Sequence, residues 1–181
     1  MEINARCTLD EKGLRAMQGV VMFRGKDPRR VIRRHTILFA VCTVLMILCA
    51  LILYEDRVMF ILALVMAAVC PLTILLYHYA YYISPRRIYR KLKLADTENR
   101  YVFGETAVVI SSCGREGYKA HETFPYALLH KVMETSEYFF LFIDKLRAYT
   151  VDKSEMTNTE IEAVRAALLA TPDLTYKACN Y

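Results

Sequence analysis

The chain has 181 residues, of which 55% are hydrophobic, and its net charge is +5. The basic residues gather in two short flanks of an apolar region and the rest of the chain is acidic, which leaves no basic face for nucleic acid. The six cysteines are scattered without a C-x-x-C pair, and this spacing argues against a zinc knuckle or a redox motif.

The N-terminal segment is expected to form a strand followed by a helix. Residues 2–9 alternate apolar and polar side chains with the period of a half-buried strand. Asp10 is a plausible N-cap for an amphipathic helix over residues 11–23, which Pro28 is expected to end. Because a lone strand is not stable, we expect it to pair with the sheet of the C-terminal domain, across everything that lies between them.

Two long apolar segments follow, at residues 36–54 and about 58–82, and they contain no Asp, Glu, Lys or Arg. A helix rises 1.5 Å per residue, so about 20 apolar residues cross a hydrocarbon core of roughly 30 Å. Backbone groups in lipid must bond within their own segment, which favours helices. Only Glu55, Asp56 and Arg57 separate the segments, and residues 35–83 are therefore predicted to form an antiparallel transmembrane hairpin.

The interior of the hairpin is simple. It carries no charged residue, which argues against an ion or solute carrier. Pro71 is expected to kink the second helix. His35 and His78 lie at the same end of the hairpin and could approach each other, but two imidazoles rarely make a metal site, and an aromatic belt is the favoured interpretation. We predict neither a metal nor a cofactor.

Two basic flanks border the hairpin at the same end. Lys and Arg beside membrane segments stay in the cytoplasm, so both termini are expected there, with the lipid bilayer as a partner. The same residues could bind anionic headgroups, although the simpler interpretation is that they only set the topology. The candidate membrane-surface contacts are Arg29, Arg30, Arg33, Arg34, Arg86, Arg87, Arg90 and Lys91.

The C-terminal domain is expected to be mostly antiparallel strands followed by one helix. Residues 126–134 fit a helical turn as well as a strand. Thr157 or Thr159 can open the helix in a capping box, and Pro172 closes it. The expected strands are residues 100–103, 107–112, 118–124, 138–143 and 147–151. This order predicts an α+β protein with a small curled sheet or open barrel and a helix packed over one end.

These expectations divide the chain into four parts. They are an N-terminal strand and helix with a basic flank (1–34), the hairpin (35–83), a basic juxtamembrane linker (84–94) and a cytoplasmic β domain (95–181).

Three stretches of the β domain, residues 124–135, 138–143 and 148–153, resemble the YcxB-like family of bacterial membrane proteins, as does the layout of the whole chain. The resemblance implies a domain similar to bacterial pleckstrin-homology-like (PH-like) folds, with seven strands closed by a helix. Asp152 stands where many relatives look as if they carry proline, before the lysine matching Lys153. The family implies no activity for particular residues.

The chain contains no G-x-S-x-G, P-loop or dinucleotide-binding glycine motif. His121 and Glu122 are neighbours on a strand, so they point to opposite faces and form no acid–base pair. His130 or Lys131 could form a helical surface pair with Glu134. Cys113, in a glycine-rich turn, has no clear base beside it.

The sequence therefore predicts a non-catalytic membrane protein, whose cytoplasmic domain is an interaction module for a protein partner or for self-association. The alternative is a sensor of anionic lipid headgroups that uses the basic flanks. A membrane enzyme or transport subunit is the third hypothesis.

Overall fold

The computed structural model describes residues 3–8, 10–52, 54–92, 98–113, 119–145 and 147–179. The chain forms two compact units. Residues 28–84 form a hairpin unit, and residues 1–27 fold together with residues 85–181 in a sheet unit. The segments before and after the hairpin therefore share one folded unit, although they are far apart in the sequence.

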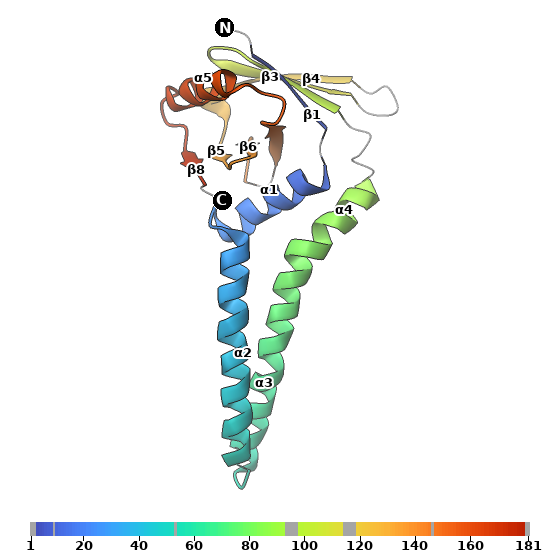
Figure 1. The fold of residues 1–181 in the computed structure, drawn as a ribbon, viewed down its shortest axis with the longest axis vertical. Coiled ribbons are helices and arrows are strands. Elements are labelled where there is room, and N and C mark those ends of the chain that lie inside the picture. The colour runs from blue at the N-terminus through green and yellow to red at the C-terminus, as the bar shows by residue number, and fades with distance from the viewer. Residues whose placement is uncertain are drawn as a thin grey trace. The chain divides into compact units, whose positions relative to one another are not determined.

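The hairpin unit contains α2 (Pro28–Ile52) and α3 (Arg57–His78), which pack against each other along their length (Figure 1). Both helices are long and apolar enough to cross a membrane. The Asp56 side chain opens α3 by accepting hydrogen bonds from the backbone N–H groups of Val58 and Met59. The buried residues of the pair are mostly small, which permits the close approach of two helices: Ala50, Ala63, Ala67 and Cys70.

The boundary between the first two helices differs from the prediction. Helix α1 (Glu11–Phe23) ends well before Pro28, because Arg24 takes a left-handed conformation (φ 52°) and its N–H donates to the carbonyl of Val20. Pro28 instead opens α2, where its missing N–H costs nothing and its fixed φ suits a first turn. The basic flank after Pro28 is thus the beginning of α2.

Helix α3 continues through Pro71 and runs into a π-helical turn at Tyr79–Ile83 and then α4 (Ser84–Leu92). Residues 86–91 of the second basic flank therefore lie in a helix. His35 stacks on Tyr77 with ring centroids 5.7 Å apart, and His78 stacks on Tyr82 at 5.6 Å. Among the described residues no three or more metal-binding side chains come together.

The sheet unit begins with an N-terminal sheet of four antiparallel strands in the order β1-β2-β3-β4. Ile3 lies opposite Phe103, and Thr8 lies opposite Glu98, so the predicted pairing of the first strand with the later domain is confirmed. Asp10 caps α1 as predicted, accepting a hydrogen bond of 2.6 Å from the N–H of Gly13. The strands are β1 (Ile3–Thr8), β2 (Glu98–Phe103), β3 (Ala107–Cys113) and β4 (Lys119–Pro125).

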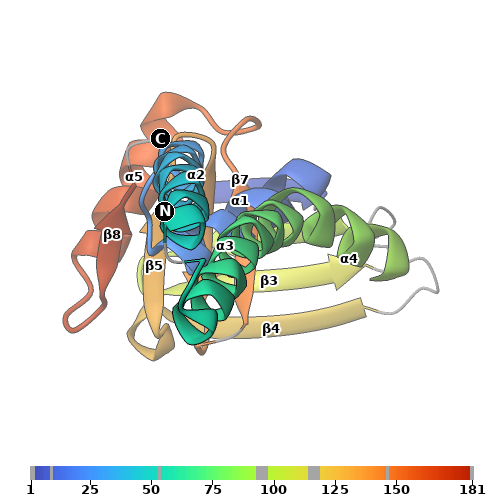
Figure 2. The ribbon, with the colours of Figure 1, turned by 90° about the horizontal axis from the view of Figure 1, so that it is seen from below.

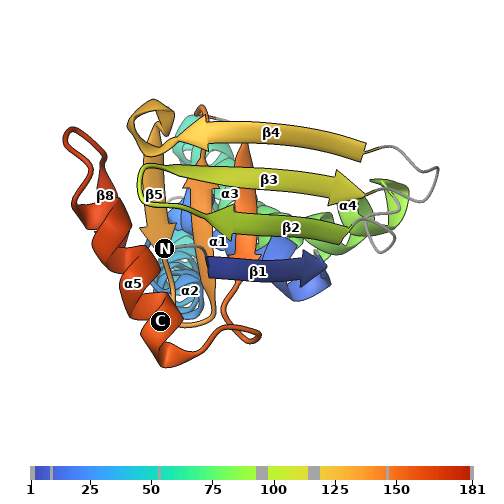
Figure 3. The same ribbon diagram turned by 90° about the horizontal axis from the view of Figure 1, so that it is seen from above.

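A C-terminal sheet has the order β7-β6-β5-β8. The ambiguous segment before it resolves into a 3₁₀ turn (Tyr126–Leu128) and a strand. The last strand was not predicted and pairs parallel to β5. The strands are β5 (Lys131–Glu134), β6 (Tyr138–Phe142), β7 (Ala148–Asp152) and β8 (Tyr176–Ala178). Figure 3 shows the strands of the two sheets crossing each other.

The C-terminal sheet is covered on both faces. Phe139 and Leu141 of β6 face the main core, which the N-terminal sheet and α5 (Asn158–Leu169) complete. Phe140 and Phe142 face a second core that includes residues of α1, and α1 packs against β7 (Figure 2). All four side chains are at most 1% exposed, and the burial of each contributes about 1.5–3 kcal/mol. The strand expected at residues 138–143 is therefore present as β6 and is buried on both faces.

Helix α5 begins in a capping box made by Thr157 and Glu160, which decides between the two predicted starts. The mixed α+β class is confirmed. Strand pairing in the described part of the chain yields two four-stranded sheets rather than a closed barrel, and there are eight strands instead of the seven that the resemblance implies.

Candidate functional site

All eight basic residues proposed as membrane-surface contacts are exposed. Residues 29–34 lie in the first turns of α2, and residues 86–91 lie in α4. Arg86 also has a partner within the sheet unit, since its Nε lies 3.6 Å from Glu11 Oε2. Their binding to lipid headgroups stays a prediction.

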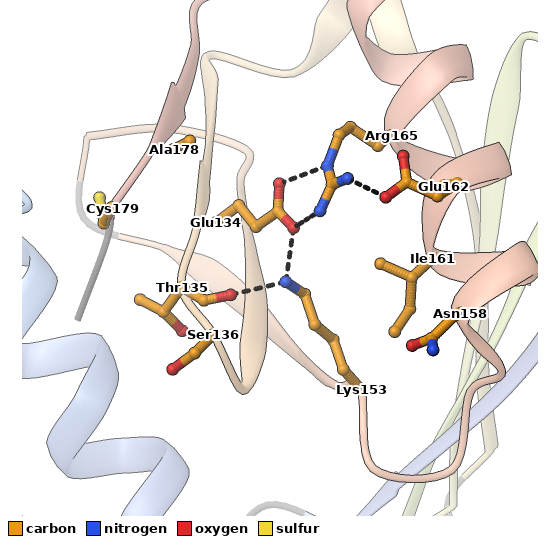
Figure 4. Close-up of a pocket in the computed structure, with 10 residues that line it drawn as sticks. All are labelled: Glu134, Thr135, Ser136, Lys153, Asn158, Ile161, Glu162, Arg165, Ala178 and Cys179. Atoms are coloured by element: carbon orange, nitrogen blue, oxygen red, sulfur yellow. Dashed lines mark hydrogen bonds and ion pairs between the residues drawn. The ribbon is translucent and has the colours of Figure 1, made fainter.

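A different group of charged residues is the most organised polar feature of the sheet unit. Glu134 ends β5 and points toward α5, with only 6% of its side chain exposed (Figure 4). Lys153, just after β7, donates from Nζ to Glu134 Oε1 at 2.5 Å and to the carbonyl of Thr135 at 2.6 Å. The same ammonium lies 4.3 Å from the ring centroid of Phe139. Lys153 is thus held by three neighbours and is 8% exposed.

Two further residues bind the same carboxylate. Arg165 of α5 donates from Nε to Glu134 Oε2 at 3.0 Å and from Nη2 to Oε1 at 2.6 Å, the paired geometry that suits guanidinium and carboxylate. Its Nη1 also donates to Glu162. The hydroxyl of Tyr176, on β8, donates to Glu134 Oε2. We call Glu134, Lys153, Arg165 and Tyr176 the Glu134 cluster.

The cluster keeps Glu134 ionised. Burial alone would raise the pKa of this carboxyl, but the hydrogen bonds from Arg165, Lys153 and Tyr176 outweigh burial and lower the pKa from 4.5 to about 2. Burial and the bond to Glu134 raise the pKa of the Tyr176 hydroxyl, and the bonds to Glu134 and Glu162 raise the pKa of Arg165. The charged forms of Glu134 and Arg165 are therefore strongly favoured.

A pocket of about 510 Å³ opens beside the cluster. Its charged lining is balanced, because Glu134 and Glu162 face Lys153 and Arg165. Both Glu134 oxygens accept bonds from within the cluster, and Lys153 Nζ donates to Glu134 and to the carbonyl of Thr135. A general base or an amine nucleophile needs a free lone pair. The arrangement therefore suits a structural role, in which the cluster connects β5, β7, β8 and α5.

The sequence interpretation of Glu134 was wrong. It was expected to form a helical surface pair with His130 or Lys131, whereas it lies in a strand and is buried. Lys131 and Glu134 point to opposite faces of β5, because side chains alternate along a strand. The missed partners, Lys153 and Arg165, are 19 and 31 residues away in the chain. The only local indication that Glu134 is buried was its position directly after the apolar residues Val132 and Met133.

The other candidates for chemistry remain weak. His121 and Glu122 do point to opposite faces of β4, as predicted. His121 Nδ1 lies 2.9 Å from Ser111 Oγ on the exposed face of the sheet, but no carboxylate in the described part of the chain hydrogen-bonds to His121. A serine–histidine pair without a group to orient the histidine is a poor nucleophile. Cys113 is exposed at the end of β3, and the glycine-rich turn after it lies outside the described residues.

Comparison with known families supports the resemblance noted from the sequence. Residues 114–168 match the family model described as YcxB-like protein. The YcxB-like assignment is confirmed over this segment. No match was found among the curated proteins or the solved structures. The YcxB-like segment contains three members of the Glu134 cluster, whereas Tyr176 lies beyond it, as do β1 and α1.

Proposed function

We propose that the protein is a non-catalytic, membrane-anchored interaction module, and that the outer face of its N-terminal sheet binds an acidic segment of a cytoplasmic protein. In this proposal the sheet unit is a PH-like domain without a closed barrel. Two crossing sheets with a C-terminal helix packed on their core support the PH-like part of the proposal.

The observation that carries the proposal is the exposure of that sheet face. Along β1 every second side chain is buried, and the alternate residues Asn4, Arg6 and Thr8 are exposed. At the other edge of the sheet His121 and Thr123 of β4 are exposed. Two helices of the sheet unit pack elsewhere, α5 on the main core and α1 on the C-terminal sheet. Neither of them covers this face of the four strands (Figure 3).

The chemistry of this face favours an acidic partner. The strand register aligns Arg6, Arg100, Ser111 and His121 in one row across all four strands. Arg100 is partly neutralised, since its Nε lies 3.1 Å from Glu98 Oε1. The row still offers two guanidinium groups, a hydroxyl and an imidazole, which are donors for carboxylates.

The two apolar helices supply the anchor in this proposal. Both basic flanks lie at the open end of the hairpin, and by the positive-inside rule this end and both termini are cytoplasmic. The sheet unit is then held at the inner face of the membrane, close to membrane-bound or cytoplasmic proteins.

Site-specific photo-crosslinking in cells tests the proposal. A photoreactive residue at Asn4 or Thr123 should crosslink to a discrete partner, and one at Ala166, exposed on α5, should not. The crosslink should be lost in Arg6→Glu and kept in Lys12→Glu, which reverses a charge at an exposed position on α1. Equal crosslinking in both charge-reversal variants would show that the sheet face does not select an acidic partner.

The second candidate function is a sensor of anionic lipid headgroups, and the exposure of all eight basic flank residues favours it. In this case α4 contacts the membrane surface. Backbone hydrogen exchange in α4 should then be slower in lipid nanodiscs that contain phosphatidylglycerol than in discs of phosphatidylcholine alone. Identical exchange in the two lipids would remove this candidate.

A further inference from the structure

A second pocket, of about 280 Å³, lies in the sheet unit where α1, β5 and β8 meet. It is separate from the exposed sheet face and from the Glu134 cluster. Val20 is fully buried at its base, and Val21 is half exposed at 49%. Its polar lining consists of Arg24, Lys131, Thr175 and Lys177. We call this the basic pocket.

The described residues that line the basic pocket include three cations and no acid. No aspartate or glutamate is among them. None of the three forms an ion pair with a carboxylate in the described part of the chain. Other basic residues of the sheet unit do form such pairs, for example Arg15, Arg100 and Arg165. Like charges gathered in a concave site repel one another, and an anion relieves that repulsion.

The two lysines are also held in place, which distinguishes them from ordinary solvated side chains. Lys131 Nζ lies 4.3 Å from the ring centroid of Phe142, its cross-strand neighbour. Lys177 Nζ donates to the backbone carbonyl of Arg24 at 2.5 Å, which joins β8 to the end of α1. An ammonium has three donors, so each lysine keeps donors for a ligand. Side chains that are already positioned lose less entropy when they bind.

Close packing fixes the walls of the pocket as well. Gly25 has φ +76°, and a Cβ at this position would lie 2.5 Å from Cys179 Sγ and 3.2 Å from Lys177 Cε. The end of α1 therefore approaches β8 more closely than any other residue type would allow.

We propose that the basic pocket binds a phosphate ester that carries an apolar group. Two lysines and one arginine match the charge of a phosphate, and the Thr175 hydroxyl is a further donor at the exposed rim. The half-exposed side chain of Val21 provides apolar surface for the attached group. A phospholipid and a soluble phosphate monoester both present this chemistry. The site adds a ligand to the proposed function and does not depend on it.

Methyl NMR of the full chain in neutral detergent micelles tests the proposal. Met133 lines the pocket, and Met156 belongs to the main core and serves as an internal reference. Dihexanoyl phosphatidic acid should shift the Met133 methyl signal saturably and leave Met156 unchanged. Phenyl phosphate, a soluble monoester with an apolar group, identifies the source: a shift with both ligands means that a soluble phosphate monoester is also recognised, and a shift with phosphatidic acid only means that the ligand is a lipid.

Matched variants decide whether the cations of the pocket are responsible. Lys131→Gln/Lys177→Gln should weaken phosphatidic acid binding by about tenfold or more, since one charge-assisted hydrogen bond is worth about that factor. Lys12→Gln/Lys145→Gln removes two charges from exposed positions elsewhere in the sheet unit and should change binding by less than about twofold. The unchanged Met156 signal reports that each variant is folded.

Three results would overturn the proposal. The first is an unchanged Met133 signal with both phosphate ligands. The second is an equal shift with dihexanoyl phosphatidylcholine, whose headgroup is zwitterionic. The third is equal weakening in the two double variants, which would mean that only the overall charge of the protein matters.

Discussion

Strand β5 carries a charged group on each of its faces, and the two groups are built in opposite ways. On the α5 side, Glu134 accepts bonds from Lys153, Arg165 and Tyr176, and its charge is fully compensated. On the α1 side, the basic pocket gathers three cations without an acid. The α1 side is held instead by apolar contacts such as Val20 with Met133 and by the close approach at Gly25. The same short strand thus separates charges that stabilise the fold from charges that are free to bind.

The largest expected effect is the loss of the compensated charge. Glu134→Gln keeps the shape of the side chain but leaves Lys153 buried beside Arg165 without a counter-ion. The free energy of unfolding of the sheet unit should fall by about 3–5 kcal/mol, as when one partner of a buried ion pair is removed. Denaturant unfolding of the full chain in detergent, followed by tyrosine near-UV circular dichroism, measures this change.

Glu162→Gln is the matched control, because this carboxylate bonds to the same arginine but its side chain is 67% exposed. It should cost less than about 1 kcal/mol. Similar losses in the two variants would mean that burial of the ion pairs does not distinguish the Glu134 cluster.

The second prediction concerns acid. The pKa of Glu134 is lowered from 4.5 to about 2 in the folded protein, so the unfolded chain binds its proton more tightly. The contribution of Glu134 to stability is therefore complete above pH 4.5 and is lost as the pH falls through about 2. At about 1.4 kcal/mol per pKa unit it amounts to about 3 kcal/mol.

Unfolding measured between pH 5 and pH 2 (about the interval between the two pKa values) should show this loss in the native protein and in Glu162→Gln. In Glu134→Gln the free energy of unfolding should fall by about 3 kcal/mol less over the same pH interval. An equally steep decline in Glu134→Gln would place the acid sensitivity in other carboxylates.

The third prediction concerns the packing that holds the α1 side. Gly25→Ala introduces a Cβ both at a positive φ and 2.5 Å from Cys179 Sγ, so it should lower the free energy of unfolding by about 2 kcal/mol. Gly25→Asn should be nearly as harmful, because asparagine tolerates the left-handed conformation but has the same Cβ. Adding Cys179→Ala removes the nearest atom and should restore part of the stability. An Asn variant as stable as the native protein would show that only the backbone conformation matters.

The smallest expected effect is the change in stability when the two lysines of the basic pocket are replaced. Lys131→Gln/Lys177→Gln should lower the free energy of unfolding by only about 1 kcal/mol, because no ion pair is lost and only a hydrogen bond and a cation–π contact at the surface are removed. Its main effect should appear in ligand binding. A loss comparable to that of Glu134→Gln would mean that these lysines are structural, and the contrast between the two faces of β5 would fail.

The sequence predicted the local elements well wherever a periodic pattern or a capping residue marks them. The alternation in β1, the Asp10 cap of α1, the apolar run of β6 and the capping box of α5 were all recognisable. The errors lie where a residue allows two roles. Pro28 can follow one helix or open the next, and it opens α2. The segment 126–134 is too short for the spacing of its apolar residues to distinguish a helix from a strand. Strand β8 has only three residues and depends on its pairing with β5.

By itself the sequence determined two apolar helices long enough for a membrane, a pattern of strands, and a resemblance to YcxB-like proteins that was confirmed over residues 114–168. These follow from local composition and spacing, because a helix or strand buries one face of its own residues. The tertiary structure alone decided which charges meet. Glu134 reaches partners 19, 31 and 42 residues away, while Lys131, three residues before it, faces the basic pocket. Charge attraction acts through space, so the pairing of ions depends on how the sheets and helices pack and leaves no periodic signal in the chain.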